Sequence, residues 1–246
     1  ASGVAGSAFS ASQYCVVVTK SDTNKILFEY DCGRNQPLGI RPKTAGGDSQ
    51  TWFNGYKYRG GFQYSRLDGG DITVVNYVSL EDYVKGVIPY EMSASWPLEA
   101  LKAQALCART YVATNVNSYS KYGFDVTNNT YSQVYRGTTG ANSTTDAAVN
   151  ATAGKYVRYQ GKLCSTLFFS SDGGSTESSQ NVFITAYPYL TGVIDPFEAA
   201  VDFKYKTWEY SYTGAELSSK LNGKGNSIGE IVKVTPTYSP TGNCIR

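Results

Sequence analysis

The chain has 246 residues, a formal net charge of +2, 14% aromatic residues and no histidine. The absence of histidine excludes Ser-His-Asp and Cys-His catalysis and every His-ligated metal site, so acid–base chemistry would fall to Asp, Glu, Tyr, Lys or Cys. The charge is too weak for a nucleic-acid footprint, and no stretch approaches the roughly 20 apolar residues of a membrane span.

The first 75 residues have the pattern of β-strands. The runs YCVVVTK and KILFEYD flank the polar turn SDTN, and GYKYRGGFQYSRL and DITVVNYV flank the turn signal DGGD. Cys15 and Cys32 lie near each other in the first hairpin, so a disulfide between them stays an open alternative, and the odd total of five cysteines leaves at least one thiol unpaired. We expect residues 1–75 to form a β-rich part that is continuous with the rest.

Two helices follow, with a short break between them. Ser79 begins an S-x-x-D helix start, and the helix is expected over 80–88, where Pro89 ends it. Glu91 lies in the break, where its side chain is free to face a cleft. Without further information this glutamate would be an exposed loop residue or a cap on the next helix.

The second helix is expected over 97–115. Ser95 is a suitable N-cap, and Pro97 sits where the first turn tolerates proline. The run LEALKAQALCARTYV consists almost entirely of helix formers, and its small residues allow close packing, so this helix is long and buried. Cys107 in this run is interpreted as a small core residue.

The remaining chain alternates polar loops with short elements. A long polar loop covers 117–143, TTDAAVNATAGK is a short helix, and YVRYQGKLCSTLFFSS is a hairpin around Gln160 and Gly161. The Gly-rich stretch SSDGGSTES lacks the spacing of a phosphate loop. Gly173 and Gly174 would let the backbone approach a ligand, and the alternative is a tight turn with a capping role.

Three stretches together resemble one family. They are YVSLEDYVKGVIPYEMSASWPLEALKAQALCARTY, TYSQVYRG and FFSSDGGSTESSQNVF followed by YPYL. The chain resembles the stage II sporulation protein D family, which includes amidase-enhancer proteins of bacterial cell walls, over roughly residues 56–215. The resemblance implies a lytic transglycosylase, a lyase that cleaves the β-1,4 bond between N-acetylmuramic acid and N-acetylglucosamine in denuded peptidoglycan strands and leaves 1,6-anhydro ends.

The resemblance also implies the site. It places the single catalytic acid at Glu91 and aligns Lys102 and Arg109, seven residues apart on one helix side, with basic residues that could meet a muramic-acid carboxylate. Surface charge is the alternative for Lys102. The other expected substrate-binding residues are Tyr131, Gln133, Tyr135, Ser170, Ser171, Gly173, Gly174, Thr176, Glu177 and Tyr189.

One motif departs from the family pattern. Some relatives bind zinc through a T-H-C-Q stretch, which here is Thr130 to Gln133 without a His or Cys ligand. We therefore expect no metal and no other cofactor, and Tyr131 and Tyr135 are candidates to order this loop instead.

One carboxylate is chemically sufficient for a transglycosylase. It can protonate the leaving oxygen and then accept a proton from the sugar's own 6-hydroxyl, whereas a hydrolase uses a carboxylate pair. Burial of Glu91 among Tyr90, Met92 and Trp96 would favour its protonated form by desolvation. Glu177 or Asp172 could be a second carboxylate, which would favour hydrolysis.

The sequence thus indicates an α+β fold of mixed β-sheets with a few helices, one of them long and buried. A substrate groove is expected at the helix–sheet junction, within a glycan-cleaving region over 76–246. The alternative function is a non-catalytic glycan-binding module that stimulates a cell-wall amidase. The expected partners are glycan strands and a wall-remodelling protein such as an amidase, not nucleic acid. The expected location is extracytoplasmic, at the cell envelope, either secreted or anchored through a segment removed before Ala1.

Overall fold

The computed structural model describes residues 15–31, 36–43, 50–67, 71–201 and 207–245. The chain divides into two compact units, Ala1–Leu167 and Phe168–Arg246. The α+β class is confirmed, because helices and several small antiparallel sheets alternate along the chain. The strands of the first 75 residues share the first unit with the three main helices, while the boundary between compact units falls after Leu167.

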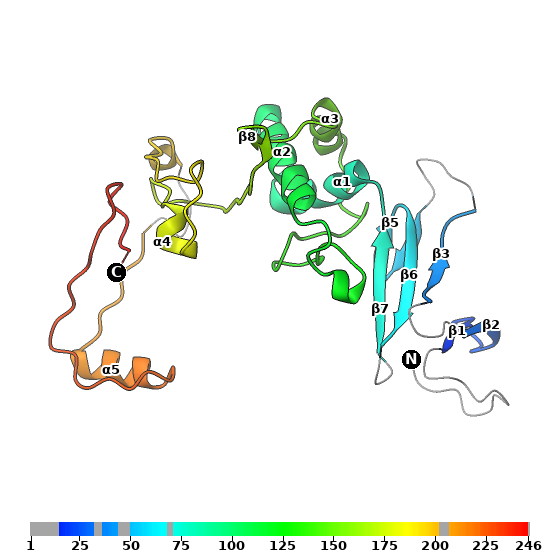
Figure 1. Ribbon diagram of the computed structural model, residues 1–246, viewed down its shortest axis with the longest axis horizontal. Coiled ribbons are helices and arrows are strands. Elements are labelled where there is room, and N and C mark those ends of the chain that lie inside the picture. The colour runs from blue at the N-terminus through cyan, green and yellow to red at the C-terminus, as the bar shows by residue number, and fades with distance from the viewer. Residues whose placement is uncertain (1–14, 32–35, 44–49, 68–70, 202–206, 246) are drawn as a thin grey trace. The chain divides into compact units, whose positions relative to one another are not determined.

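The first seven strands form three separate antiparallel sheets (Figure 1). β1 (Cys15–Thr19) pairs with β2 (Ile26–Asp31), and β4 (Thr51–Phe53) pairs with β5 (Tyr56–Tyr58). The third sheet has the order β3-β6-β7 and consists of β3 (Leu38–Ile40), β6 (Gly61–Arg66) and β7 (Ile72–Tyr77). Cys15 lies opposite Asp31, and the question of a Cys15–Cys32 disulfide falls on Cys32, outside the described residues.

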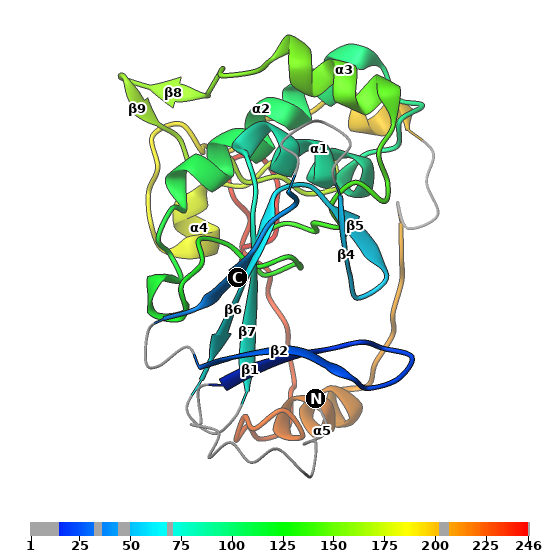
Figure 2. The same ribbon diagram turned by 90° about the vertical axis from the view of Figure 1, so that its right-hand side faces the viewer.

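Three helices gather at one end of the β6–β7 ribbon (Figure 2). They are α1 (Leu80–Glu91), α2 (Leu98–Thr114) and α3 (Ser143–Ala151). Their contact surfaces form one core with the sheet, because apolar side chains at helical spacing face the same side. The fully buried members of this core are Val84, Val87, Ile88, Leu101, Ala105, Ala108, Ala148 and Val149.

Two expected helix boundaries are wrong. Pro89 does not end α1, which continues to Glu91. A proline in the last turn removes only one N–H, and the Met92 N–H donates to the Ile88 carbonyl at 2.9 Å and closes the helix beyond it. Ser95 is not the N-cap of α2, because the helix begins after Pro97 and has no side-chain cap.

The segments between and after these helices are short ordered pieces. The loop after α2 contains the 3₁₀ helix η1 (Ser120–Tyr122), and Asn142 is the N-cap of α3, where its side chain accepts the Thr144 N–H. The expected hairpin is confirmed as β8 (Arg158–Tyr159) and β9 (Lys162–Leu163). Its two turn residues, Gln160 and Gly161, both have positive φ, as the tight hairpin turn requires.

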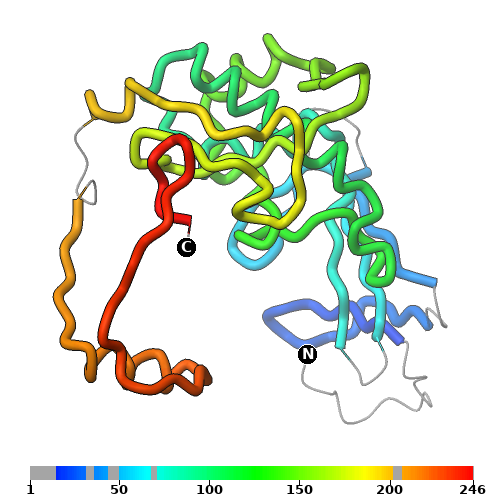
Figure 3. Tube along the Cα trace, turned by 60° about the vertical axis from the view of Figure 1, so that its left-hand side comes forward, coloured from blue at the N-terminus to red at the C-terminus, as the bar shows by residue number. Residues whose placement is uncertain are grey.

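The second unit has little regular structure. Its elements are α4 (Ser179–Phe183), the 3₁₀ helix η2 (Glu198–Ala200) and α5 (Gly214–Asn222). The C-terminal segment returns beside the residues that follow Phe168 (Figure 3), where the Asn243 side-chain amide donates to the carbonyls of Ser175 and Thr176. In the described part of the chain, none of the helices combines the length and apolar character needed to cross a bilayer.

Candidate functional site

Glu91 is the last residue of α1 and is half-buried. Its Oε1 accepts a hydrogen bond from the Val134 N–H at 3.2 Å. The other carboxylate oxygen receives no hydrogen bond from any residue that the structure describes. The helix end therefore presents one carboxylate with one oxygen held and one oxygen available to a ligand.

The expected apolar enclosure of Glu91 is only partial. Tyr90 is 38% exposed and Trp96 is 51% exposed, while Met92 is half-buried. Trp96 precedes α2 in the open turn between the helices, where it contributes little cover. Glu91 is thus accessible from the surface rather than sealed among these three side chains.

The segment that holds Glu91 has an extended alternating pattern. Gln133, Tyr135 and Gly137 are buried, whereas Val134 and Arg136 are half-buried. Alternation with a period of two places Val134 and Arg136 on the same side of the chain. The segment therefore directs its core residues inward and its two intervening residues toward the surface.

The 133–139 segment is fixed to α1 and β5 by backbone contacts. The Arg136 N–H donates to the Gly86 carbonyl of α1 at 3.4 Å, and the Thr138 N–H donates to the Lys57 carbonyl of β5 at 2.7 Å. A Cβ at Gly86 would lie 2.4 Å from the Tyr135 ring, so only glycine allows this close approach. The position of Val134 against Glu91 is consequently set by the core.

Aromatic rings and one guanidinium lie around Tyr90, the residue that precedes Glu91. The Arg136 guanidinium lies over the Tyr56 ring at 4.8 Å from its centroid, a cation–π contact. The Tyr90 ring packs against Gly140, where a Cβ would lie 2.9 Å from it. Burial raises the pKa of Tyr90, the neighbouring Tyr56 adds to this, and the positive charge of Arg136 opposes it. Arg136, Tyr56 and Tyr90 thus form one electrostatically connected group.

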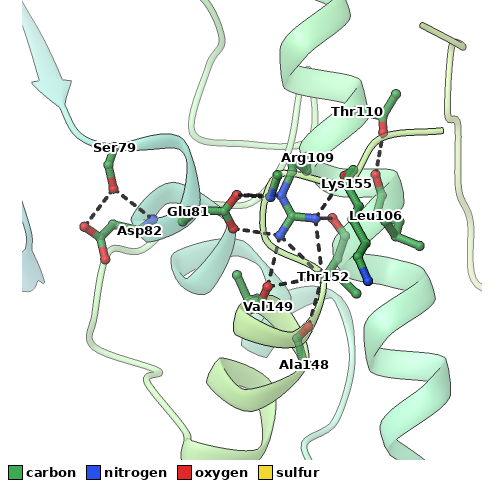
Figure 4. Close-up of polar contacts among 12 residues, drawn as sticks. Ser79, Glu81, Asp82, Leu106, Arg109, Thr110, Ala148, Val149, Thr152 and Lys155 are labelled. Carbon is green, nitrogen blue, oxygen red and sulfur yellow. Dashed lines mark hydrogen bonds and ion pairs between the residues drawn. The ribbon is translucent and has the colours of Figure 1, made fainter. Parts of the chain in front are cut away.

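Arg109 lies in the core and does not reach the surface. Its side chain is fully buried, its Nε and Nη2 donate to the two carboxylate oxygens of Glu81 at 2.9 and 2.7 Å, and other N–H groups donate to the Val149 carbonyl and to Thr152 Oγ1 (Figure 4). The guanidinium therefore joins α1, α2 and the end of α3. The expectation that Arg109 meets a substrate carboxylate does not fit this placement.

Glu81 is the counter-ion of this buried cation. Burial opposes its ionisation, but hydrogen bonds from Arg109 and from the Gly154 N–H outweigh it and hold the pKa of this carboxyl below its ordinary value. Sequence reasoning recognised Glu81 only as part of a helix start. Its pairing with a residue 28 positions later is a consequence of helix packing.

The remaining expected residues of the first unit separate into core and surface. Lys102 pairs with Glu99 at 2.6 Å one helical turn away, which is the surface-charge alternative. Gln133 is buried and accepts the Tyr83 hydroxyl, and Tyr135 is buried and donates to Asn76 at 2.7 Å. Gln133 is thus turned to the core, Tyr135 contributes only to the inner wall of a cleft, and Tyr131 is 82% exposed.

A cleft of about 890 Å³ lies at the helix–sheet junction of the first unit. Its walls come from β7, the C-terminal end of α2 and the loop over 116–129, and they include Tyr83 and Tyr135. Glu91, Lys102 and Arg109 do not line it. The expected groove at the junction therefore exists, but it is not where the expected acid lies.

The other expected residues belong to the second unit and form a tight turn. Gly173 and Gly174 have φ of 70° and 102°, and the Gly174 N–H donates to the Asp172 side chain. Thr176 exchanges hydrogen bonds with the backbone of Val193, so it is occupied locally. The remaining members are Ser170, which is exposed, and Ser171 and Tyr189, which are half-buried.

The carboxylates of the second unit are also held locally. Hydrogen bonds from Ser239 and Asn181 lower the pKa of Glu177, which disfavours a proton-donating role. Oxygens of Asp172, Asp195 and Glu198 lie within 4.8 Å of one another. Such a group could hold a divalent cation, but acidic clusters also occur without one, and its members accept local hydrogen bonds from Gly174, Phe197 and Ser171.

Arg136 and Tyr56 are not among the residues that the sequence predicts for the site. Arg136 directly follows the predicted residue Tyr135 in the TYSQVYRG stretch, and an arginine in a polar loop is a signal that could have identified it. The role of the Val134 N–H had no signal, because every residue carries a backbone donor.

Comparisons with known proteins show which proteins this part of the chain resembles. A model of the family described as Stage II sporulation protein matches residues 68–159. The chain is 42% identical to an uncharacterized protein of Brachyspira hyodysenteriae over 169 residues, 68% of this chain and 45% of that relative. It is 41% identical to the amidase enhancer of Bacillus subtilis over 137 residues, 56% of this chain and 18% of the relative.

The stage II sporulation protein D of Bacillus subtilis is 35% identical over 183 residues, 67% of this chain and 52% of the relative. The chain thus spans about half or less of the length of these relatives. The family model covers α1, α2, α3 and the segment that holds Glu91, so the site lies in a stage II sporulation protein domain. The chain therefore contains a stage II sporulation protein domain and is similar to relatives named stage II sporulation protein D and amidase enhancer.

Proposed function

We propose that the protein is a lytic transglycosylase that cleaves denuded peptidoglycan glycan strands, with Glu91 as the single general acid and base. The observation that carries this proposal is the half-buried Glu91 carboxylate, with one oxygen held by the Val134 N–H and the other without a partner among the described residues. The names of the relatives, which concern sporulation and amidase stimulation, support a role at the cell wall.

In the first step, protonated Glu91 donates its proton to the glycosidic oxygen that leaves with N-acetylglucosamine. The bond between that oxygen and the anomeric carbon of N-acetylmuramic acid breaks, and positive charge develops on the ring. The released carboxylate stabilises this charge. The Val134 N–H keeps the carboxylate oriented during the transfer, which preserves the geometry that catalysis needs.

In the second step, the Glu91 carboxylate removes the proton from the 6-hydroxyl of the same N-acetylmuramic acid. The oxygen of that hydroxyl bonds to the anomeric carbon and closes the 1,6-anhydro ring. The proton returns to Glu91, no water is consumed, and the enzyme is ready for the next bond.

The carboxylates that share α1 with Glu91 do not supply a hydrolase partner. Glu81 and Asp82 lie nine or ten residues earlier, which is about 15 Å along a helix, whereas paired glycosidase carboxyls lie roughly 5–9.5 Å apart. Both are also engaged, Glu81 by Arg109 and Asp82 by Arg59 at 2.7 Å. A mechanism with one carboxylate suits this helix.

The test is mass spectrometry of purified denuded glycan after incubation with the protein. The proposal expects 1,6-anhydro-muramic ends, and Glu91→Gln should remove cleavage while binding remains. Glu99→Gln, an exposed carboxylate on α2, is the matched control and should cleave normally. Reducing ends would indicate a hydrolase, and full activity of Glu91→Gln would place the acid elsewhere.

The second candidate is a glycan-binding module that stimulates a cell-wall amidase. It is favoured by the 41% identity with a protein named amidase enhancer. In that case glycan strands bind but stay intact, and amidase activity rises when the protein is added. Both functions require an extracytoplasmic location at the cell envelope, which we include in the proposal.

A further inference from the structure

We propose that Arg136, which is stacked on Tyr56 and lies two residues after Val134, whose N–H binds Glu91, is the binding site for the lactyl carboxylate of an N-acetylmuramic acid residue, and that it selects glycan strands without stem peptides. This inference rests on the proposed function, because it takes the glycan strand as the ligand. It replaces Arg109 and Lys102 as the cation of the site, since Arg109 is buried against Glu81 and Lys102 is paired with Glu99.

The guanidinium of Arg136 is oriented but not neutralised. It lies 4.8 Å from the centroid of the Tyr56 ring and is half-buried. Within the residues that the structure describes, no carboxylate forms an ion pair with it. By contrast, Arg59, Lys102 and Arg109 each pair with an acid. A partly desolvated arginine without an acidic partner is a suitable site for an anion.

The position of Arg136 relative to Glu91 is fixed by the chain. Val134, which binds Glu91, and Arg136 are two residues apart on the same side of an extended segment, so their Cα atoms lie about 7 Å apart. Both residues are anchored through Tyr135, whose ring is buried against Gly86. An anion at Arg136 is therefore bound by the same short segment that holds the acid.

The lactyl carboxylate is the anion that this geometry fits. Each N-acetylmuramic acid of a denuded strand carries one, and it is free only where the stem peptide has been removed, since the peptide converts it into a neutral amide. The planar guanidinium can donate two parallel hydrogen bonds to a carboxylate, an arrangement that a neutral amide cannot match. The flat rings of Tyr56 and Tyr90 beside it suit the apolar face of a sugar.

The test measures binding in the Glu91→Gln background, where strands stay intact. The ligands are denuded glycan, peptide-bearing glycan and an oligomer of N-acetylglucosamine, which has no carboxylate. Arg136→Gln should weaken binding of denuded glycan about tenfold, as loss of a charge-assisted hydrogen bond does, and leave the neutral oligomer unchanged. Arg136→Lys keeps the positive charge but loses the planar pair of donors, so its affinity for denuded glycan should lie between that of the Glu91→Gln protein and that of the Arg136→Gln variant. Arg158→Gln, on the exposed β8–β9 hairpin, removes the same charge and should have no effect.

Equal loss for all three ligands in Arg136→Gln, or no loss for denuded glycan, would overturn the inference. Circular dichroism of each variant confirms that it is folded. The outcome is separable from that of the proposed function. If Arg136→Gln weakens binding of denuded glycan but the unmodified protein never cleaves it, the proposed transglycosylase activity is wrong and the proposed recognition site holds. If anhydro ends form but Arg136→Gln binds every ligand as before, the recognition site fails and the activity stands.

Discussion

Replacing Arg109 by methionine tests whether this residue is structural. The substitution removes the cation between the two oxygens of Glu81 and the donors to the Val149 carbonyl and Thr152. Breaking a buried ion pair costs about 3–5 kcal/mol, and the lower end applies because the Glu81 side chain is 33% exposed. The Lys155 carbonyl also loses the Arg109 N–H that it accepts, which adds about 1 kcal/mol. We expect the free energy of unfolding to fall by about 4 kcal/mol.

Urea-induced unfolding followed by far-ultraviolet circular dichroism measures this loss. The double variant Glu81→Gln, Arg109→Met removes both charges and should recover part of it, because an unpaired buried charge is the larger cost. The partly exposed Lys102→Met on the same helix is the control and should stay within about 0.5 kcal/mol of the unmodified protein. A loss below about 1 kcal/mol in Arg109→Met, together with lost glycan binding, would refute the structural assignment.

Two further predictions concern acid stability and the site loop. The native contacts of Glu81 hold its pKa below the ordinary value of 4.5. The stabilisation that these contacts provide is therefore complete above pH 4.5 and is lost as the pH falls through the lowered pKa. On acidification, the free energy of unfolding should decline less steeply in Glu81→Gln than in the unmodified protein. An equal decline in both proteins would contradict this. Gly137→Ala should destabilise by about 3 kcal/mol, because φ is +60° and the new Cβ would lie 2.1 Å from the Lys57 carbonyl. Gly154 has a φ of +70° but open space around it, so Gly154→Ala should lose only about 1 kcal/mol of stability in thermal unfolding. Similar losses of stability in Gly137→Ala and Gly154→Ala would contradict the steric explanation.

The boundaries of helices and turns could be predicted where residues close in sequence determine them. Ser79 caps α1 through the Asp82 N–H, and Gln160-Gly161 turns the β8–β9 hairpin, both as the sequence indicates. Pro89 misled because its local effect is one missing N–H, whereas the burial of Ile88 beside it stabilises the helix in which it stands. Tertiary packing overrode the local preference there.

The site was predicted less well than the fold for a related reason. The sequence shows that Arg109 stands among apolar residues, but not that α1 brings Glu81 to it. Tyr135 was chosen as a ring for sugar, yet it is buried against Gly86, because an alternating segment hides every second side chain. Residue type indicated which groups could act, and only the path of the chain separates those facing the surface from those facing the core.

The extended segment that ends in Arg136 has a consequence for how such a protein can diversify. Val134, whose N–H binds Glu91, and Arg136 are two residues apart on either side of the buried Tyr135, so the backbone fixes the spacing between these two positions. Substitutions at the outlying Tyr131, which is almost wholly in solvent, leave that spacing intact. Exposed positions such as Tyr131 can therefore vary in sequence without moving Val134 or Arg136. Deleting or inserting a single residue between Gln133 and Gly137 would change the spacing between Glu91 and Arg136.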